Sequence, residues 1–256
     1  MEKLRKPFQG VKNIVRFNWH FYALILGWFI LTFLILKIFQ EVLILRIFLL
    51  ALNSFIAIVV AVSLVVSAYV YDFSGLYEFT FLNDLKISQD SKVANINAGF
   101  DETSEILKAK FSLEKIEMMD FYDEEKHTEV SIKRARKLYP NSPETVKIST
   151  EKIPFQNEYF DDVFLIFAAH EIRNNEERIR FFKEINRVSK TDSNIIITEH
   201  LRDVPNFLAY NIVFLHFLSL NNWKNTFEKS QFKIEKHQKQ NPFINVFYLK
   251  KYGTST

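Results

Sequence analysis

Two long apolar runs near the start of the chain constrain its fold more than any other feature. Phe21–Phe39 contains nineteen residues with a single charge, Lys37, and Ile47–Tyr71 contains twenty-five residues with none. About 20 apolar residues in a helix cross the roughly 30 Å hydrocarbon core of a bilayer, and the helix satisfies its own backbone hydrogen bonds there. We therefore predict a transmembrane helical hairpin. The alternatives are buried core helices and a cleaved signal peptide, and the length of the first run argues against the latter.

The charges before the first run predict the orientation of this hairpin. Five basic side chains and one acidic side chain precede it, and positive flanks stay on the cytoplasmic side. We expect a two-pass protein of the inner (cytoplasmic) membrane, with the lipid bilayer as a partner and with both the N-terminus and everything after Tyr71 in the cytoplasm. The net charge of +3 lies largely in this cluster, and no basic stripe with interleaved aromatics follows. Nucleic acid is therefore not an expected partner, and the oligomeric state is left open.

The rest of the chain alternates short β-rich runs with helical segments, which predicts an α/β domain. Such alternation favours a Rossmann-like, mostly parallel sheet with helices on both faces. Two final apolar runs, Phe232–Glu235 and Phe243–Leu249, predict a C-terminal antiparallel hairpin. We divide the chain into residues 1–72, the basic N-terminus and apolar hairpin, and residues 73–256, the α/β domain. The predicted parallel strands are Lys92–Asn97, Lys115–Phe121, Thr145–Ser149, Asp161–Phe167 and Asn194–Glu199, and the clearest helices are Glu124–Tyr139 and Glu176–Ser189.

A glycine and an acid follow the first two predicted strands. Gly99 is the only glycine between Gly75 and Gly253, and it stands at a strand-to-helix turn where a nucleotide-type ligand needs close backbone approach. Asp120, about 20 residues on, is placed to accept hydrogen bonds from ribose hydroxyls, with Asp123 as the alternative. The structural alternatives are an ordinary turn for the glycine and helix capping for the acids.

The order and spacing of these features resemble the class I S-adenosylmethionine-dependent methyltransferases. The likeness is carried by the glycine turn, the acid after strand two, an "IPF" loop, "FDDVFLIFAAHEI" and "RFFKEINRVSK". In that family the first loop cradles the methionine part of the cofactor, the acid holds the ribose, and the loop before the fourth strand touches the adenine. The resemblance therefore implies S-adenosyl-L-methionine as cofactor, with binding residues Asn97, Gly99, Asp101, Asp120, and Thr150 or Glu151. Three further segments, "KHTEVSIKRAR", "FAAHEIRN" and "EHLRDVPNFLAYN", resemble a bacterial membrane-anchored subgroup that also begins with two predicted spans.

Two histidine–glutamate pairs follow later strands and are the candidate catalytic residues. His170-Glu171 follows the fourth predicted strand and Glu199-His200 ends the fifth, so both should reach the carboxyl edge of the sheet. A histidine there could remove a proton from a hydroxyl or amine acceptor. The alternative is a structural hydrogen-bond and ion network. No metal site is expected, because adjacent residues in a strand point in opposite directions.

The segment Val204–Leu220 reads either as a helix buried against the sheet or as a lid over a hydrophobic substrate pocket. The candidate substrate contacts in and before it are Arg202, Asp203, Tyr210 and His216. The preferred function is a membrane-anchored methyltransferase acting on a small lipophilic acceptor. The alternative is a catalytically degenerate, methyltransferase-like binding or scaffold protein, which is favoured by Asn97 and Ala98 standing where the family has glycines.

Overall fold

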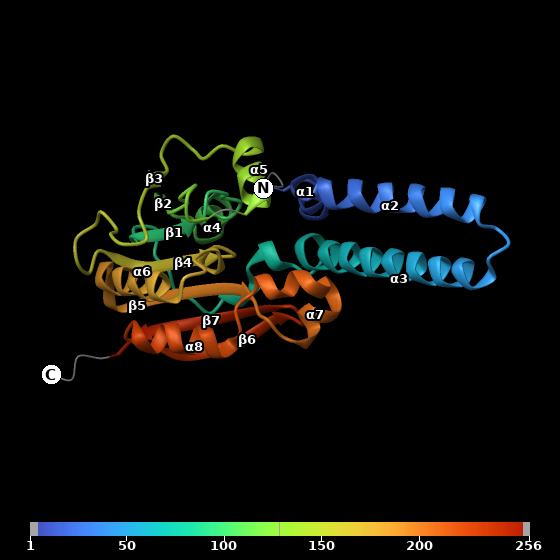
Figure 1. Cartoon of the computed structure of the whole chain (residues 1–256). Helices are drawn as coiled ribbons and strands as arrows, with labels where there is room; N and C mark the ends of the chain where they lie inside the picture. The colour runs from blue at the N-terminus through green and yellow to red at the C-terminus, as the bar shows by residue number, and fades with distance from the viewer. Residues whose placement is uncertain (1–4, 128, 253–256) are drawn as a thin grey trace.

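Two antiparallel helices project from one end of the molecule. The computed structural model describes residues 5–127 and 129–252, and α2 (Trp19–Ile38) and α3 (Leu43–Ala68) form a hairpin that extends from the remainder of the chain (Figure 1). By length and composition both helices are long and apolar enough to cross a membrane, and only 6% of the apolar window in each is buried. Leu24, Phe33, Ile44 and Phe55 are among their exposed side chains.

Polar side chains join the two helices of the hairpin. Asn53 of α3 donates a hydrogen bond to the hydroxyl of Thr32 on α2 at 2.9 Å, and it accepts one from the indole N–H of Trp28 at 2.9 Å. In an apolar surrounding such interhelical bonds contribute on the order of 1 kcal/mol, because the alternative is an unsatisfied polar group. The hairpin is therefore held in one register at its middle.

A seven-stranded sheet forms the centre of the rest of the chain, in the order β3-β2-β1-β4-β5-β7-β6. β1 to β5 are parallel to one another, β7 runs antiparallel to β5, and β6 runs antiparallel to β7. The fold class predicted from the sequence is thus confirmed, including the C-terminal antiparallel hairpin. The strands are β1 (Val93–Asn97), β2 (Ile116–Asp120), β3 (Val146–Lys147), β4 (Phe160–Ile166), β5 (Ser189–His200), β6 (Phe232–Asn241) and β7 (Ile244–Lys251).

Each face of the sheet has its own hydrophobic core. One core joins the sheet to Phe182 and Ile185 of α6 and to Trp223 of α8. The other joins it to Leu107 of α4 and to apolar residues of the segment after α3, such as Phe79. The helices of this part of the chain are α4 (Ser104–Phe111), α5 (Val130–Leu138), α6 (Asn175–Val188), α7 (Val204–Tyr210) and α8 (Leu220–Lys229), with short helical turns η1 (Tyr69–Phe73), η2 (Leu76–Glu78), η3 (Thr80–Leu82), η4 (Ala169–Glu171) and η5 (Asn211–His216).

A short helix that the sequence analysis does not predict, α1 (Gln9–Phe17), joins the hairpin to the sheet domain. Asp72, in η1, caps this helix. Its two carboxylate oxygens accept hydrogen bonds from backbone amides in the first turn of α1, Gly10 at 2.8 Å and Val11 at 2.9 Å. A carboxylate at a helix N-terminus satisfies free N–H groups and favours the positive end of the helix dipole. Further along α1, Phe17 packs edge-on against Phe100 of the loop after β1, so the helix contacts both parts of the molecule.

Candidate active site

The carboxyl edge of the sheet has the geometry of a ligand crevice. β1 lies between β2 and β4, and the chain leaves β1 toward β2 before returning to β4 on the other flank. In open α/β sheets a crevice forms where the strand order reverses in this way. The residues after β1 and β2 form the glycine side of this edge (Gly99, Asp120, Arg136 and Thr150). Those after β4 and β5 form its histidine side (His170, Glu171, Glu199 and His216).

Gly99 occupies a position that requires glycine. Its φ is +91°, which L side chains rarely adopt, and a Cβ there would lie 2.8 Å from Cδ of Arg136 and 3.0 Å from Cβ of Tyr122. The sequence-based interpretation of a close approach at this turn is therefore supported by the conformation. The group that makes the approach within the described chain is the Arg136 side chain of α5.

Asp120 ends β2 and is fully buried beside that arginine. Its Oδ2 accepts hydrogen bonds from Nη1 of Arg136 and Nδ2 of Asn141, each at 2.8 Å, while Oδ1 accepts one from the backbone N–H of Tyr122 at 2.8 Å. Lys147 lies 3.5 Å away. The carboxylate thus points to the ligand side of the edge, but Arg136 lies between it and Gly99.

Two adjoining cavities flank the Arg136 side chain. One of about 490 Å³ is lined by residues after β2 and β3, including Tyr122, Lys147 and Thr150, and one of about 390 Å³ is lined by Gly99 and residues of α5. Thr150 is buried and donates a hydrogen bond to Glu177 at 2.6 Å, whereas its neighbour Glu151 is exposed and does not line the larger cavity.

The other two residues of the expected cofactor set differ from each other in their roles. Asn97 accepts a hydrogen bond from the N–H of Gly99 at 2.8 Å and so shapes the turn. Its buried Nδ2 has no partner among residues 5–127 and 129–252. Asp101 instead accepts the backbone N–H groups of Thr103 and Ser104, at 2.9 and 3.0 Å, and caps α4.

On the histidine side, the sequence-predicted pairs come together across strands. Oε2 of Glu199, on β5, lies 2.6 Å from Nδ1 of His170, which stands on η4 after β4. Burial alone would lower the pKa of His170, but the carboxylates of Glu199 and Glu171 raise it to about 10. The bond to Glu199 also fixes the ring, which leaves Nε2 directed away from β5.

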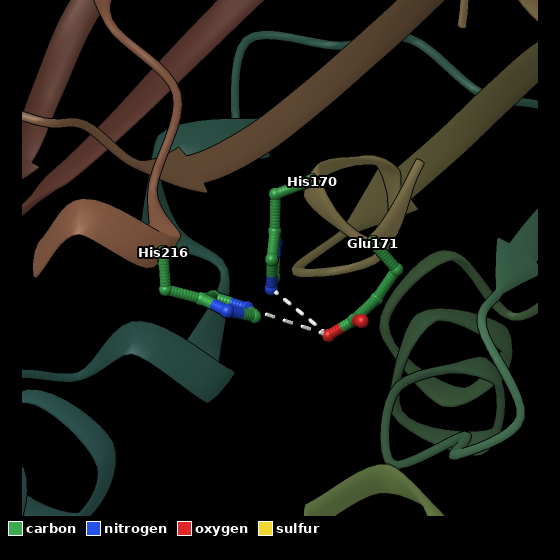
Figure 2. Close-up of side chains that lie close together, drawn as sticks. All are labelled: His170, Glu171 and His216. Atoms are coloured by element: carbon green, nitrogen blue, oxygen red, sulfur yellow. Dashed lines mark ion pairs between the residues drawn. The ribbon is translucent and has the colours of Figure 1, made fainter. Parts of the chain in front are cut away.

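Glu171 and His216 complete this cluster. Oε1 of Glu171 lies 3.4 Å from Nε2 of His170 and 3.6 Å from Nε2 of His216, and the three side chains point toward one another (Figure 2). His170 and Glu171 belong to a 3-10 turn and not to a strand. Their side chains therefore do not alternate across a strand, contrary to the expectation from the sequence, and both point into the same cluster.

His200 is separate from the cluster and is buried. Its Nδ1 pairs with Oδ1 of Asn206 at 2.9 Å and its Nε2 with the hydroxyl of Tyr71 at 2.7 Å, so both nitrogens have partners. Burial lowers the pKa of His200 to about 4. The ring is therefore neutral at physiological pH. Tyr71 lies in η1, so the end of the hairpin contributes to the site.

The remaining candidate substrate residues support the lid segment, by which we mean α7 and η5, residues 204–216. Arg202 donates to the backbone carbonyl oxygens of Phe217 at 2.9 Å and Leu215 at 2.7 Å. Asp203 caps α7 by accepting the N–H of Asn206 at 3.1 Å. The ring of Tyr210 packs edge-on against His200 with centroids 5.5 Å apart. Only His216 joins the candidate catalytic residues.

Comparisons with known proteins agree with this geometry. Residues 100–197 match the family model for the methyltransferase domain. Residues 100–197 are therefore a methyltransferase domain, and the sheet has the fold of the class I S-adenosylmethionine-dependent enzymes. S-adenosylmethionine is the cofactor that this domain type indicates. No curated protein matches the chain.

Solved structures show the methyltransferase fold at low sequence identity. A SAM-dependent methyltransferase from Aquifex aeolicus has 17% identity and a TM-score of 0.50 over 71% of this chain and 94% of that one. A chain of the complex between the Haloferax volcanii Trm112 methyltransferase activator and the putative methyltransferase has 10% identity and a TM-score of 0.52, over 72% and 92%. Geranyl diphosphate C-methyltransferase from Streptomyces coelicolor A3(2) has 10% identity and a TM-score of 0.50, over 70% and 79%.

The glycine side of the methyltransferase domain fits an adenosyl ligand. The glycine turn has no room for a Cβ, and the buried Nδ2 of Asn97 and hydroxyl of Tyr122 have no partner within the described residues. Cavities of about 490 and 390 Å³ are of the size that small-molecule ligands occupy. The side chain of Arg136 must move for a ribose to reach Asp120.

Three residues of this site are missed by sequence reasoning. Arg136 lies in the basic stretch "KRARK", where nothing distinguishes it from Arg134. Tyr71 reads as an interfacial aromatic, and its contact with His200 depends on how α3 meets the sheet. Glu129, whose Oε1 lies 3.1 Å from Nδ1 of His216, reads as a helix-start residue. The resemblance of "KHTEVSIKRAR" to the bacterial subgroup was the only signal near Glu129 and Arg136.

Proposed function

We propose that the chain is a membrane-anchored methyltransferase that transfers a methyl group to a small lipophilic acceptor, with residues 1–72 as anchor and residues 73–256 as catalytic domain. The observation that carries this proposal is the surface of the lid segment. Its apolar side chains face outward, and its exposed fractions include 69% for Val204, 65% for Leu208 and 77% for Ile212. The lid segment packs beside α3 at the base of the hairpin (Figure 1).

An exposed apolar patch that continues into two bare apolar helices is best explained by a bilayer. Large exposed patches of this kind mark membrane or partner surfaces, and the hairpin would place the lid segment at the level of the headgroups. The basic flank before α2 favours a cytoplasmic N-terminus and therefore a cytoplasmic domain. This is the arrangement of a two-pass protein of the inner membrane.

A lipophilic acceptor fits this arrangement, because it would concentrate in the same layer as the lid segment. It would enter beneath residues 204–216 and reach the histidine side of the edge. The Streptomyces enzyme, which has the same fold, was solved with geranyl diphosphate, so the fold can accommodate an acceptor with an isoprenoid chain. The acceptor atom is left open.

The chain's own residues would hold and orient the reactants. When bound, S-adenosylmethionine supplies an electrophilic methyl group, so much of the acceleration can come from alignment. Asp120 would accept the ribose hydroxyls once Arg136 has moved, and Thr150 lines the cavity expected to hold the adenine. His170, held by Glu199, would orient the acceptor by donating a hydrogen bond from Nε2.

The function is tested with the full chain in nanodiscs. We would supply S-adenosylmethionine with a labelled methyl group and a total lipid extract, and search the organic phase for labelled products. A product that depends on the chain supports the proposal. The matched variants are Leu208→Glu, on the exposed face of the lid segment, and Glu228→Gln, on α8. The first should reduce labelling and the second should not, whereas labelling only of water-soluble compounds would contradict a lipophilic acceptor.

A degenerate binding or scaffold protein is the second candidate, and the position of Arg136 favours it. Its guanidinium occupies the space between Gly99 and Asp120 and pairs with that carboxylate at 2.8 Å. Calorimetry with S-adenosylhomocysteine separates the two. A folded chain that does not bind it at millimolar concentration would be a scaffold.

A further inference from the structure

The cluster of His170, Glu171 and His216 has the spacing of a metal site. The ligand atoms of the three side chains all lie within 4.8 Å of one another, and the two imidazole Nε2 atoms lie 3.4 and 3.6 Å from Oε1 of Glu171. Metal–ligand bonds of about 2.0–2.1 Å in tetrahedral geometry separate neighbouring ligand atoms by about 3.4 Å. Two of the three separations therefore already match, and the third is no longer than 4.8 Å (Figure 2).

Glu171 provides a second, independent indication. Its side chain is only 4% exposed, and Oε2 has no hydrogen-bond partner within residues 5–127 and 129–252. A buried carboxylate oxygen that receives no hydrogen bond is unfavourable, so such oxygens pair with cations or bind metals. The free oxygen is thus a buried acceptor in the same cluster as two imidazoles.

The surroundings of His170 match those of a metal-bound histidine. Nδ1 is 2.6 Å from Oε2 of Glu199, which is completely buried. Histidines that bind metals usually donate their other N–H to a carboxylate, which fixes the ring and makes the free nitrogen more basic. Glu199 therefore leaves Nε2 of His170 available on the side that faces Glu171.

The charges around His216 come from two further residues. Oε1 of Glu129 lies 3.1 Å from Nδ1 of His216, and the Arg173 guanidinium contacts both this ring and, at 3.2 Å, Glu129. Arg173 and Glu129 are about 40% exposed, so they form the outer rim of the cluster. Arg173 also lies 3.0 Å from Nε2 of His216, so its guanidinium must move before that nitrogen can bind an ion. Glu129 offsets the charge of Arg173, and the two buried carboxylates of Glu171 and Glu199 exceed the single positive charge that His170 can carry.

We propose that His170, Glu171 and His216 bind one divalent transition-metal ion on the histidine side of the active site. Two imidazoles with one carboxylate favour ions such as Zn²⁺, Fe²⁺ or Mn²⁺, whereas Mg²⁺ and Ca²⁺ prefer oxygen ligands. Three protein ligands leave open positions, one of which an oxygen of the acceptor can occupy. That last role rests on the proposed function, but metal binding itself does not.

The ion would also join two separate elements. His170 and Glu171 belong to η4, and His216 belongs to η5 at the end of the lid segment. Coordination would hold the lid segment against the strand tips. Binding should therefore protect the backbone amides of residues 211–216 from hydrogen exchange, which can be measured without any methyl acceptor.

The test uses the full chain purified in detergent, stripped of metal with a chelator and titrated with Co²⁺ by calorimetry and visible absorption. We expect one ion per chain, displaced by Zn²⁺. His216→Gln and Glu171→Gln should each weaken binding more than about 100-fold. Glu199→Gln, which removes only the support of His170, should weaken it by about 10- to 100-fold. His237→Gln, a histidine on the exposed edge strand β6, is the matched control and should bind as the wild type does.

Three results would overturn the proposal: a folded wild-type chain that binds no Co²⁺, unchanged affinity in folded His216→Gln or Glu171→Gln, or equal losses in His237→Gln. Thermal melts of each variant establish that it is folded, and His216, at 20% side-chain exposure, is the substitution least demanding of the fold. Binding of S-adenosylhomocysteine is measured in parallel. A chain that binds Co²⁺ but not S-adenosylhomocysteine would contradict the proposed function and leave the metal site intact. A chain that binds S-adenosylhomocysteine but not Co²⁺ would do the reverse.

Discussion

The two sides of the carboxyl edge hold buried carboxylates in opposite ways. On the glycine side, Asp120 is paired with the guanidinium of Arg136 at 2.8 Å, a cation supplied permanently by the chain. On the histidine side, Glu199 and Glu171 face His170, whose positive charge depends on a proton. A ligand that needs Asp120 has to displace the whole arginine side chain. On the histidine side, a metal ion has to displace only a proton. Access to Asp120 on the glycine side is therefore blocked by Arg136, whereas the carboxylates of the histidine side are open to exchange.

The largest effect should follow from removing the central group of the histidine side. His170→Ala should reduce turnover by about 10²-fold, the cost of an acceptor that is no longer held in line with the methyl group. Affinity for S-adenosylhomocysteine should stay unchanged, because His170 lies outside the cavities beside Gly99 and Thr150. Single-turnover kinetics and calorimetry measure the two quantities. Equal losses of turnover and of S-adenosylhomocysteine affinity would mean that His170 also contributes to the cofactor site on the glycine side.

Asp120→Ala should have the next largest effect, and it should reduce cofactor affinity where His170→Ala reduces turnover. Loss of charged hydrogen bonds to the ribose should weaken binding of S-adenosylhomocysteine by about tenfold to a hundredfold. Asp120→Asn, which keeps the shape but not the charge, is the control and should lose less. Circular dichroism should show an intact fold in both variants. Unchanged affinity in Asp120→Ala would remove the ribose assignment.

A smaller effect should come from opening the glycine side. Arg136→Ala frees both the Asp120 carboxylate and the space over Gly99, so binding of S-adenosylhomocysteine should become tighter, by up to about fivefold. This range corresponds to the 0–1 kcal/mol of a partly exposed ion pair. Arg134→Ala, two residues earlier on α5, is the matched control. Weaker binding in Arg136→Ala would mean that the arginine contacts the ligand instead of competing with it.

Asp162 on β4 offers a comparison, because it is a buried carboxylate with no cation in contact among residues 5–127 and 129–252. Its carboxylate accepts a hydrogen bond from Asn194 at 2.6 Å, and burial raises its pKa to about 6. The folded state therefore holds this proton more tightly than the unfolded state, so stability should fall as the pH rises from about 4 through 6, by up to about 3 kcal/mol. Urea denaturation of Asp162→Asn at pH 4 and pH 8 tests this. The pH dependence should be smaller than in the wild type, and an unchanged slope would assign it to other groups.

Much of the sheet could be predicted from the sequence because its strands are short, apolar and regularly spaced. The expected run Lys92–Asn97 corresponds to β1, and the charged residues of Glu176–Ser189 with its apolar stripe correspond to α6. β6 was predicted only to Glu235, but it continues to Asn241. The extra residues are polar because they lie on an exposed edge strand, where a polar run reads as a loop.

The site itself was only partly predictable, since its contacts join residues far apart in the sequence. The strand order brings the His170-Glu171 and Glu199-His200 pairs to one edge, as expected. The strand order does not predict the pairing of His170 with Glu199 across strands, and it does not predict that His216 faces Glu171. The helix α1 was missed because its basic residues were interpreted as a membrane flank. A cap by Asp72, 62 residues away from Gly10, leaves no local pattern.

The cap that Asp72 forms on α1 and the bond from Tyr71 to His200 have a mechanical consequence. Together they fix η1, which directly follows α3, to α1 on one side and to the end of β5 on the other. An enzyme joined to its anchor by a flexible linker can approach acceptors at a range of distances from the membrane. Under the proposed function, a catalytic domain fixed to its anchor in this way would reach acceptors at one depth of the bilayer, and that depth would be set by the protein and not by a flexible linker.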